Sequence, residues 1–200
     1  MRSSVERTTI HHKRHALRAQ GFSLIEVLVS MLVLTIGLIG AAMMQLHAFR
    51  TTEQSNFQDT AVTLARQIAD EIRANNIEMN KPPGANPFLP LSFAAPGSPG
   101  ATATNCYTGS CSAAAMAAQN IVEWKRRIAD ILPDGRLEIC RDATPVNANG
   151  DFVWCDPSGA APGAGPITIK VGWSARTPDG KGADANQPPQ VALLVTPLSQ

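Results

Sequence analysis

The chain has 200 residues, is 44% hydrophobic, and carries 17 basic and 16 acidic side chains for a net charge of +1. This length allows one domain of ordinary size with an appended element, and the near-average composition gives no argument for wholesale disorder. The charge is unevenly placed, because residues 1–21 contain five basic residues and one acidic residue, whereas the remaining residues contain 12 basic and 15 acidic ones. Basic residues confined to a prefix argue against a nucleic-acid-binding domain, whose basic residues should lie across a folded face, and favour a segment handled by a membrane machine.

An uncharged apolar run follows the basic prefix. Residues 27–44 contain no charged side chain, and an extension of the run back to Phe22 is interrupted only by Glu26. A membrane-spanning helix needs about 20 apolar residues, so the sequence predicts a span over residues 22–44. A cleaved signal peptide would have a shorter apolar core ending in a small-x-small site, but here the run continues past residues 40–42. By the positive-inside rule, the basic flank predicts a cytoplasmic N-terminus and a periplasmic C-terminal part.

The helical pattern continues beyond the predicted span. No proline occurs before Pro82, and apolar residues recur every three or four positions in the series Phe57, Ala61, Leu64, Ile68 and Ile72. This spacing places their side chains on one face of a helix. We therefore expect one long helix over residues 22–77, whose second half needs a partner to cover its apolar stripe.

The chain changes character after this helix. Residues 82–100 contain six prolines and three glycines, so residues 78–119 are predicted to form a connecting loop. The apolar spacing around Trp124 then predicts a short helix over residues 120–132, which Pro133 ends.

Short period-two patterns follow and predict four strands. They cover residues 136–141, 151–155, 167–173 and 190–196. A small antiparallel sheet in a globular part over residues 120–200 would cover the stripe of the long helix. The expected fold class is therefore α+β.

The four cysteines all lie in the C-terminal half, at Cys106, Cys111, Cys140 and Cys155. An even count behind a membrane segment favours disulfides in an oxidising space, and a zinc site would normally show a C-x-x-C spacing that is missing here. Three pairings are possible, and we favour the two local closures, Cys106–Cys111 and Cys140–Cys155. A tight turn at Asn149-Gly150 would place Cys155 opposite Thr144, so the second bridge needs a looser connection.

Catalytic, metal and nucleic-acid sites find little support in the sequence. The chain has no phosphate-binding glycine loop and no G-x-S-x-G, H-E-x-x-H or C-x-x-C motif. We therefore predict no enzyme, no catalytic residue, no cofactor and no metal, with a membrane-tethered enzyme as the different-class alternative. His11, His12 and His15 lie in the prefix, and the basic run at residues 124–127 has acidic neighbours, as on an ordinary solvated helix face.

The string Gln20–Val27, QGFSLIEV, stands between the basic prefix and the apolar run. It resembles the processing site of type IV prepilins and type II secretion pseudopilins. The resemblance implies that a prepilin peptidase removes residues 1–21 as a leader by cutting after Gly21 and methylates the new amino terminus at Phe22. It also implies that Glu26 is the acid that such proteins use for assembly.

Residues 21–46, with residues 124–127 and 132–135, resemble most closely the minor pilins of the type IV pilus modification protein PilV family. This resemblance implies a pilin fold and a low-copy subunit of a priming or tip complex, which promotes pilus assembly and hence twitching motility, adhesion or DNA uptake. The implied partners are prepilin peptidase, other minor and major pilins bound through the N-terminal helix, and the inner-membrane assembly platform. The implied location is the inner membrane and then the pilus.

The second-best resemblance is to the pseudopilin called general secretion pathway protein I. It implies a minor pseudopilin of a type II secretion system instead of a pilus subunit. That protein is as a rule shorter and lacks such a long cysteine-bearing loop, which discriminates modestly between the two families.

Glu26 also stands out on physical grounds. A carboxylate at the edge of a spanning helix costs about 2.5–3.5 kcal/mol on insertion scales, so such a residue normally has a partner or a purpose. On the filament hypothesis, Glu26 pairs with the charged amino group of Phe22, on a neighbouring subunit, once the leader is removed. The alternative is that Glu26 reaches the lipid headgroups by itself.

Overall fold

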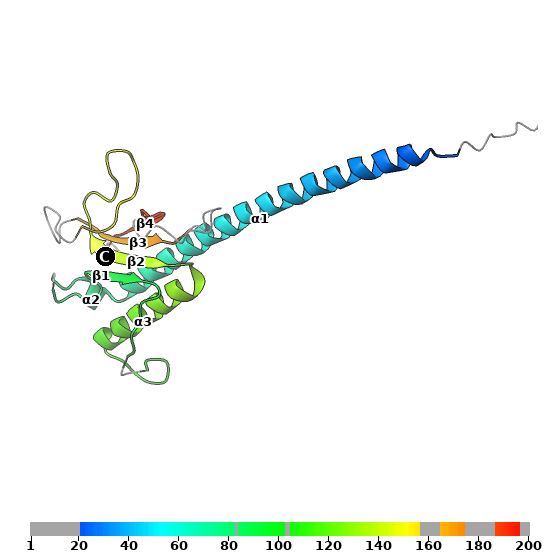
Figure 1. Ribbon diagram of the computed structural model, residues 1–200. Coiled ribbons are helices and arrows are strands. Elements are labelled where there is room, and N and C mark those ends of the chain that lie inside the picture. The colour runs from blue at the N-terminus through cyan, green and yellow to red at the C-terminus, as the bar shows by residue number, and fades with distance from the viewer. Residues whose placement is uncertain (1–20, 83, 103–104, 157–164, 175–186, 197–200) are drawn as a thin grey trace, which may run out of the picture. The chain divides into compact units, whose positions relative to one another are not determined.

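The computed structural model describes residues 21–82, 84–102, 105–156, 165–174 and 187–196 (Figure 1). The predicted leader lies outside these ranges, apart from its last residue, Gly21. The chain divides into two compact units, Met1–Ala48 and Phe49–Gln200.

The described part of the first unit is a helix without internal cover. Helix α1 (Leu24–Ala74) begins here, where the carbonyl oxygen of Ser23 accepts hydrogen bonds from the backbone N–H groups of Glu26 and Val27 at 3.0 and 3.3 Å. Every described residue of this unit is exposed. An 18-residue window of the helix has a mean hydropathy of 2.4 and no buried residue, so α1 is long and apolar enough to cross a membrane.

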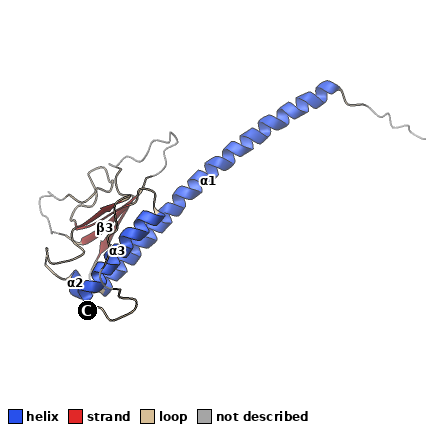
Figure 2. Cartoon of the chain, turned by 60° about the horizontal axis from the view of Figure 1, so that its bottom comes forward, coloured by secondary structure: helices blue, strands red, loops and turns tan. Residues whose placement is uncertain are grey.

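The second unit is built on the remainder of α1. The buried residues of this helix are Ala61, Leu64, Ala65, Ile68, Ala69 and Ile72. The predicted stripe is therefore confirmed, with Phe57 at its start half-buried against the same core. Figure 2 shows α1 and α3 (Ala113–Ile131) running beside each other, with the strands next to them.

A four-stranded antiparallel sheet supplies the cover that the stripe needs. Its strands are β1 (Leu91–Ala94), β2 (Arg136–Arg141), β3 (Ile167–Gly172) and β4 (Val191–Val195), in the order β1-β2-β3-β4. Paired residues such as Leu137 with Val171, and Ile139 with Ile169, are completely buried and belong to the core that contains the α1 stripe. The predicted α+β class is confirmed, as a pilin-like layout of a long N-terminal helix packed on a small antiparallel sheet.

The predicted loop over residues 78–119 is partly wrong. A short helix, α2 (Asn76–Met79), follows α1, and β1 lies inside the proline-rich stretch, where Leu91 and Phe93 alternate inward with exposed neighbours. Helix α3 also begins at Ala113, seven residues earlier than expected. The Ser112 hydroxyl caps it by accepting a hydrogen bond from the backbone N–H of Ala115 at 3.2 Å, and the alanines that follow are strong helix formers.

The predicted strand over residues 151–155 is also wrong. Only Phe152 pairs like a strand residue, in an isolated bridge with Val146. The next residues make tertiary contacts instead. The Arg136 guanidinium lies over the ring of Trp154, and Cys155 forms a disulfide with Cys140. Alternating apolar residues here cover the sheet rather than extend it.

Candidate functional site

The peptide before α1 is accessible and not helical. Gly21, Phe22 and Ser23 have no regular structure, and Phe22 is 82% exposed. A Cβ atom built on Gly21 would meet nothing within 4 Å, so the packing of this chain does not require a glycine there. Exposed, irregular peptides are the preferred substrates of proteases, and a need for glycine at this point would come from a partner that binds it.

Glu26 lies in the first turn of α1 with its side chain exposed. A carboxylate at this end of a helix interacts favourably with the helix dipole, by about 0.3–1 kcal/mol. No ion pair to Glu26 forms within the described residues. The structure thus places Gly21, Phe22 and Glu26 at one end of α1 and leaves the carboxylate available to a group on another molecule.

The helix surface that follows Glu26 is apolar on all sides. Its large side chains are between 44% exposed, at Val27, and 78% exposed, at Met44. Folded proteins in water rarely expose a contiguous apolar surface of this extent, so it requires lipid or other apolar helices around it. Gly37 and Gly40 both face open space, which leaves room for the close approach of another helix.

The four cysteines all lie in the second unit and form two disulfides. Cys106 bonds to Cys111 and Cys140 bonds to Cys155, which are the two local pairings favoured from the sequence. The connection between Cys140 and Cys155 is indeed a loose one, because its single bridge pairs Val146 with Phe152 instead of continuing a hairpin ladder.

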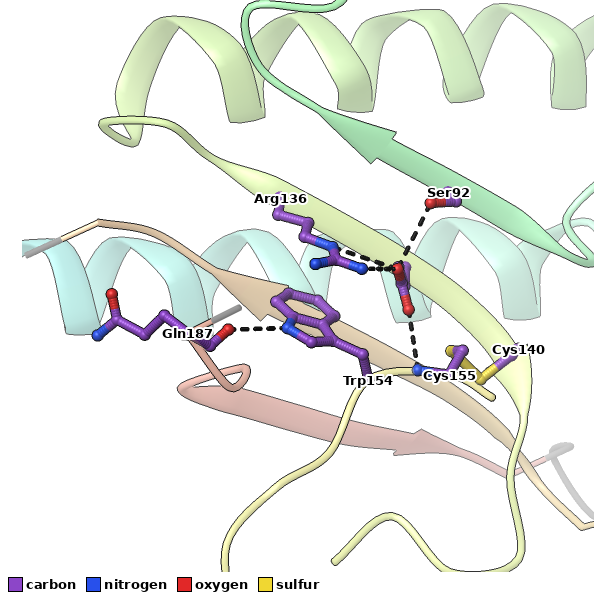
Figure 3. Close-up of polar contacts among 7 residues, drawn as sticks. Ser92, Arg136, Cys140, Trp154, Cys155 and Gln187 are labelled. Atoms are coloured by element: carbon purple, nitrogen blue, oxygen red, sulfur yellow. Dashed lines mark hydrogen bonds and ion pairs between the residues drawn. A yellow bond between two sulfur atoms is a disulfide. The ribbon is translucent and has the colours of Figure 1, made fainter. Parts of the chain in front are cut away.

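A polar cluster on the face of the sheet that carries Arg136 and Glu138 holds the Cys140–Cys155 loop in place (Figure 3). Glu138 on β2 is 5% exposed and accepts hydrogen bonds from Arg136 Nη2 at 2.6 Å and from the backbone N–H of Cys155 at 2.9 Å. Ser92 Oγ on β1 also donates to it, at 3.5 Å. One carboxylate therefore joins two strands to the end of the disulfide loop.

An aromatic ring completes this cluster. The Arg136 guanidinium lies 4.1 Å from the ring centroid of Trp154, whose Nε1 donates to the carbonyl oxygen of Gln187 at 2.8 Å (Figure 3). The ring also lies close to Gly172, where a Cβ atom would come within 2.7 Å of it. Sequence reasoning missed this cluster, although the shared strand face of Arg136 and Glu138, two residues apart, was a usable signal.

A buried ion pair joins β3 to the same loop. The Lys170 side chain is completely buried, and its ammonium group pairs with Asp142. Because a buried charge without a partner is strongly destabilising, this pair fixes the position of the loop on the sheet. With Lys170 covered, all six residues of β3 are buried.

The basic run at residues 124–127 does not form one solvated face. Trp124 is 2% exposed and its Nε1 donates to Glu71 Oε2 at 2.6 Å, which joins α3 to α1. The guanidinium groups of Arg126 and Arg127 both bond to Glu123 at 3.0 Å. The run therefore combines a core anchor with a local ion-pair cluster.

Potential metal ligands are dispersed in the described part of the chain. Within the described ranges, no three His, Cys, Asp or Glu side chains come together as a metal site would need. The three histidines of the prefix, His11, His12 and His15, lie outside these ranges.

Comparison with known proteins bears on the N-terminal segment. Residues 17–42 match the prokaryotic N-terminal methylation motif, and this match includes Gly21, Phe22 and Glu26. No curated protein and no solved structure matches the chain. The motif supports a pilin-type protein, with a type IV pilin-like or pseudopilin role that is structural rather than enzymatic.

The motif also has consequences for processing and location. A prepilin leader implies processing by prepilin peptidase and partners of the pilus type. Together with the exposed apolar part of α1, it fits a single-pass protein of the inner membrane.

Proposed function

We propose that the protein is a minor pilin of a type IV pilus, cut between Gly21 and Phe22 and methylated at Phe22. The observation that carries this proposal is the methylation motif at residues 17–42, which coincides with an exposed, non-helical peptide directly before a helix whose apolar first half is not covered by any described residue. The peptidase needs access to the peptide bond, and the mature subunit needs the apolar helix. One segment provides both.

Glu26 would act after the cut. Removal of the leader converts the amide nitrogen of Phe22 into a charged amine, and the exposed carboxylate of Glu26 is without an ion-pair partner among the described residues. Pairing of this carboxylate with the amine of a neighbouring subunit would offset the cost of a charge in an apolar environment. Cleavage thereby permits assembly, in a priming or tip complex with other minor and major pilins.

The basic prefix supports the proposed orientation. By the positive-inside rule, its excess of positive charge favours a cytoplasmic prefix, where the peptidase and the assembly platform would meet it, and a periplasmic second unit. The two disulfides of that unit fit an oxidising compartment.

Replacement of Gly21 tests the proposal. In the Gly21→Ala variant the precursor should persist, heavier by the mass of the 21-residue leader, because the added methyl group meets the peptidase and not this chain. Gly37→Ala is the matched control, since a Cβ atom there also meets nothing within 4 Å. Intact mass spectrometry of protein purified from cells gives the answer. Normal maturation of the Gly21 variant would contradict the assigned cleavage site.

A gene deletion distinguishes a pilus from a secretion system. Loss of surface pili with normal release of secreted proteins is the expected result. Loss of secretion with normal piliation would instead assign the protein to the pseudopilins, which carry a similar N-terminal segment.

A further inference from the structure

One face of the sheet carries charged residues and is nevertheless covered. Glu138 on β2 and Lys170 on β3 are register partners, and they lie on the face opposite to the core residues that alternate with them along each strand. Only 5% of Glu138 and 0% of Lys170 is exposed. Charged side chains on such a face normally reach water, so another part of the second unit lies over this pair.

The end of the Cys140–Cys155 loop provides cover for this face. The backbone N–H of Cys155 donates to Glu138 Oε2 at 2.9 Å, and Cys155 is bonded to Cys140, the next residue on the same face of β2 (Figure 3). Trp154 lies against Gly172, the next residue on the same face of β3, where a Cβ atom would come within 2.7 Å of the ring. We call Trp154 and Cys155 the loop end.

The loop covers the sheet without belonging to the hydrophobic core. No residue of the range 141–156 is fully buried, and none of them is a member of the core cluster. The core lies on the other face of the sheet, where Leu137, Ile139, Ile169 and Val171 pack with the stripe of α1. Movement of the loop end away from the sheet would therefore remove no core residue.

The buried charges also keep their ion-pair partners without the loop end. Arg136 Nη2 bonds to Glu138 Oε1, whereas the loop end uses Oε2. Lys170 pairs with Asp142, which directly follows β2 and whose backbone N–H donates to the carbonyl oxygen of Pro166 at 3.1 Å, in continuation of the β2–β3 pairing. Because unpaired buried charges are strongly destabilising, these retained pairs let the face open to water without loss of the sheet.

We propose that Cys140 and Cys155 form a redox-sensitive latch. The loop end leaves the sheet while the two thiols are reduced and lies on it once they are oxidised. Closing removes two electrons and two protons from the thiols, forms the Sγ–Sγ bond, and converts a protein disulfide that acts as the oxidant into a dithiol. Exchange with a dithiol in the reverse direction opens the latch.

The latch couples the surface of the second unit to its surroundings. Disulfides persist in oxidising spaces and are reduced in the cytoplasm, so the charged face is open before export and closed afterwards. All parts of the latch belong to the second unit, and it does not depend on the proposed leader cleavage.

The reactivity of Lys170 towards an acetylating reagent tests the latch in the full-length protein in detergent. Replacement of both latch cysteines, Cys140→Ser with Cys155→Ser, should raise the acetylation rate at Lys170 by about tenfold or more, because local opening exposes a completely buried amine. Dithiothreitol should give the same rise in the unaltered protein, and reoxidation should reverse it. Mass spectrometry of peptides measures the rate at each lysine.

The second disulfide provides the matched control. Cys106 and Cys111 enclose only exposed residues, and the backbone N–H of Cys106 bonds to Gln119 on α3. Cys106→Ser with Cys111→Ser should therefore leave the rate at Lys170 unchanged. Lys125 on α3, which is partly exposed, should react at the same rate in every variant.

Hydrogen exchange of the β2 and β3 amides distinguishes a latch from a bond that supports the whole unit. These amides should stay protected when the latch cysteines are replaced, because the core is retained. Fast exchange throughout both strands would overturn the proposal and make the disulfide a general stabiliser. An unchanged acetylation rate at Lys170 would also overturn it, since non-covalent contacts alone would then hold the loop end on the sheet.

Discussion

The two halves of α1 form one continuous helix and have opposite surroundings. Up to residue 48 all described residues are exposed and apolar side chains cover every side, whereas from residue 49 onward a single stripe is buried against the sheet and α3. The sequence difference is one of periodicity, since only the second half separates apolar from polar residues at the helical spacing. An apolar stripe on one side of a helix can be buried by other parts of the same chain, but an apolar surface on all sides can be covered only by lipid or by other helices.

Two glutamates of α1 show the same contrast. Glu71 accepts the indole N–H of Trp124 at 2.6 Å, and its carboxylate is thereby part of the folded unit. Glu26 has no such partner in the described part of the chain. A carboxylate that is hydrogen-bonded within the folded unit contributes to the stability of that unit, whereas one without a partner there can bind a group on another molecule.

The largest expected effect compares two isoleucines of α1. Ile68 is 1% exposed and Ile39 is 61% exposed, so Ile68→Ala should lower the free energy of unfolding of the second unit by about 2–5 kcal/mol, and Ile39→Ala should leave it unchanged. Tryptophan fluorescence during denaturation of the full-length protein in detergent measures this unit alone, because Trp124, Trp154 and Trp173 all belong to it. Equal losses in the two variants would mean that the first half of α1 also packs within the fold.

The parts of the fold that were predictable are those set by local periodicity. The spacing of apolar residues from Phe57 to Ile72 predicted the buried stripe, and the strand at Arg136–Arg141 has the predicted bounds. Strand β1 was not predictable, because its four residues lie within a proline-rich stretch and gain strand structure only by pairing with β2.

Residues that act through tertiary contacts were not predictable either. The alternation at residues 151–155 resembles that of a strand. Instead, the Trp154 ring lies against the Arg136 guanidinium and Cys155 forms a disulfide with Cys140, and a local sequence pattern does not show such contacts. Lys170 sits at a strand position that local reasoning assigns to solvent, but it is buried, and its ammonium group pairs with Asp142 in the loop after β2. Gly21, Phe22 and Glu26 were assigned through resemblance to a short motif, and the structure adds that all three are exposed.

A smaller change in unfolding free energy should distinguish Glu71 from Glu26. Glu71→Ala leaves the Trp124 indole N–H buried without its acceptor, so the second unit should lose about 1–3 kcal/mol of unfolding free energy. Glu26→Ala should leave this free energy unchanged, and on the proposed function it should abolish entry into pili after normal leader cleavage. Denaturation followed by tryptophan fluorescence measures the first effect, and immunodetection in sheared pili measures the second. Normal entry of the Glu26 variant into pili would leave contact with lipid headgroups as the role of this residue.

The smallest effect concerns how the two long helices begin. Ser112 caps α3 through its hydroxyl, which accepts from the backbone N–H of Ala115, so Ser112→Ala should cost about 1 kcal/mol of unfolding free energy. Ser23 serves the start of α1 through its backbone carbonyl, which alanine retains, and its hydroxyl has no hydrogen bond in the described chain. Ser23→Ala should therefore change neither the fluorescence transition nor the helix start. A loss of stability in this second variant would show that the peptide before α1 is fixed by contacts within the fold, and the accessible peptide bond that the proposed processing needs would then be missing.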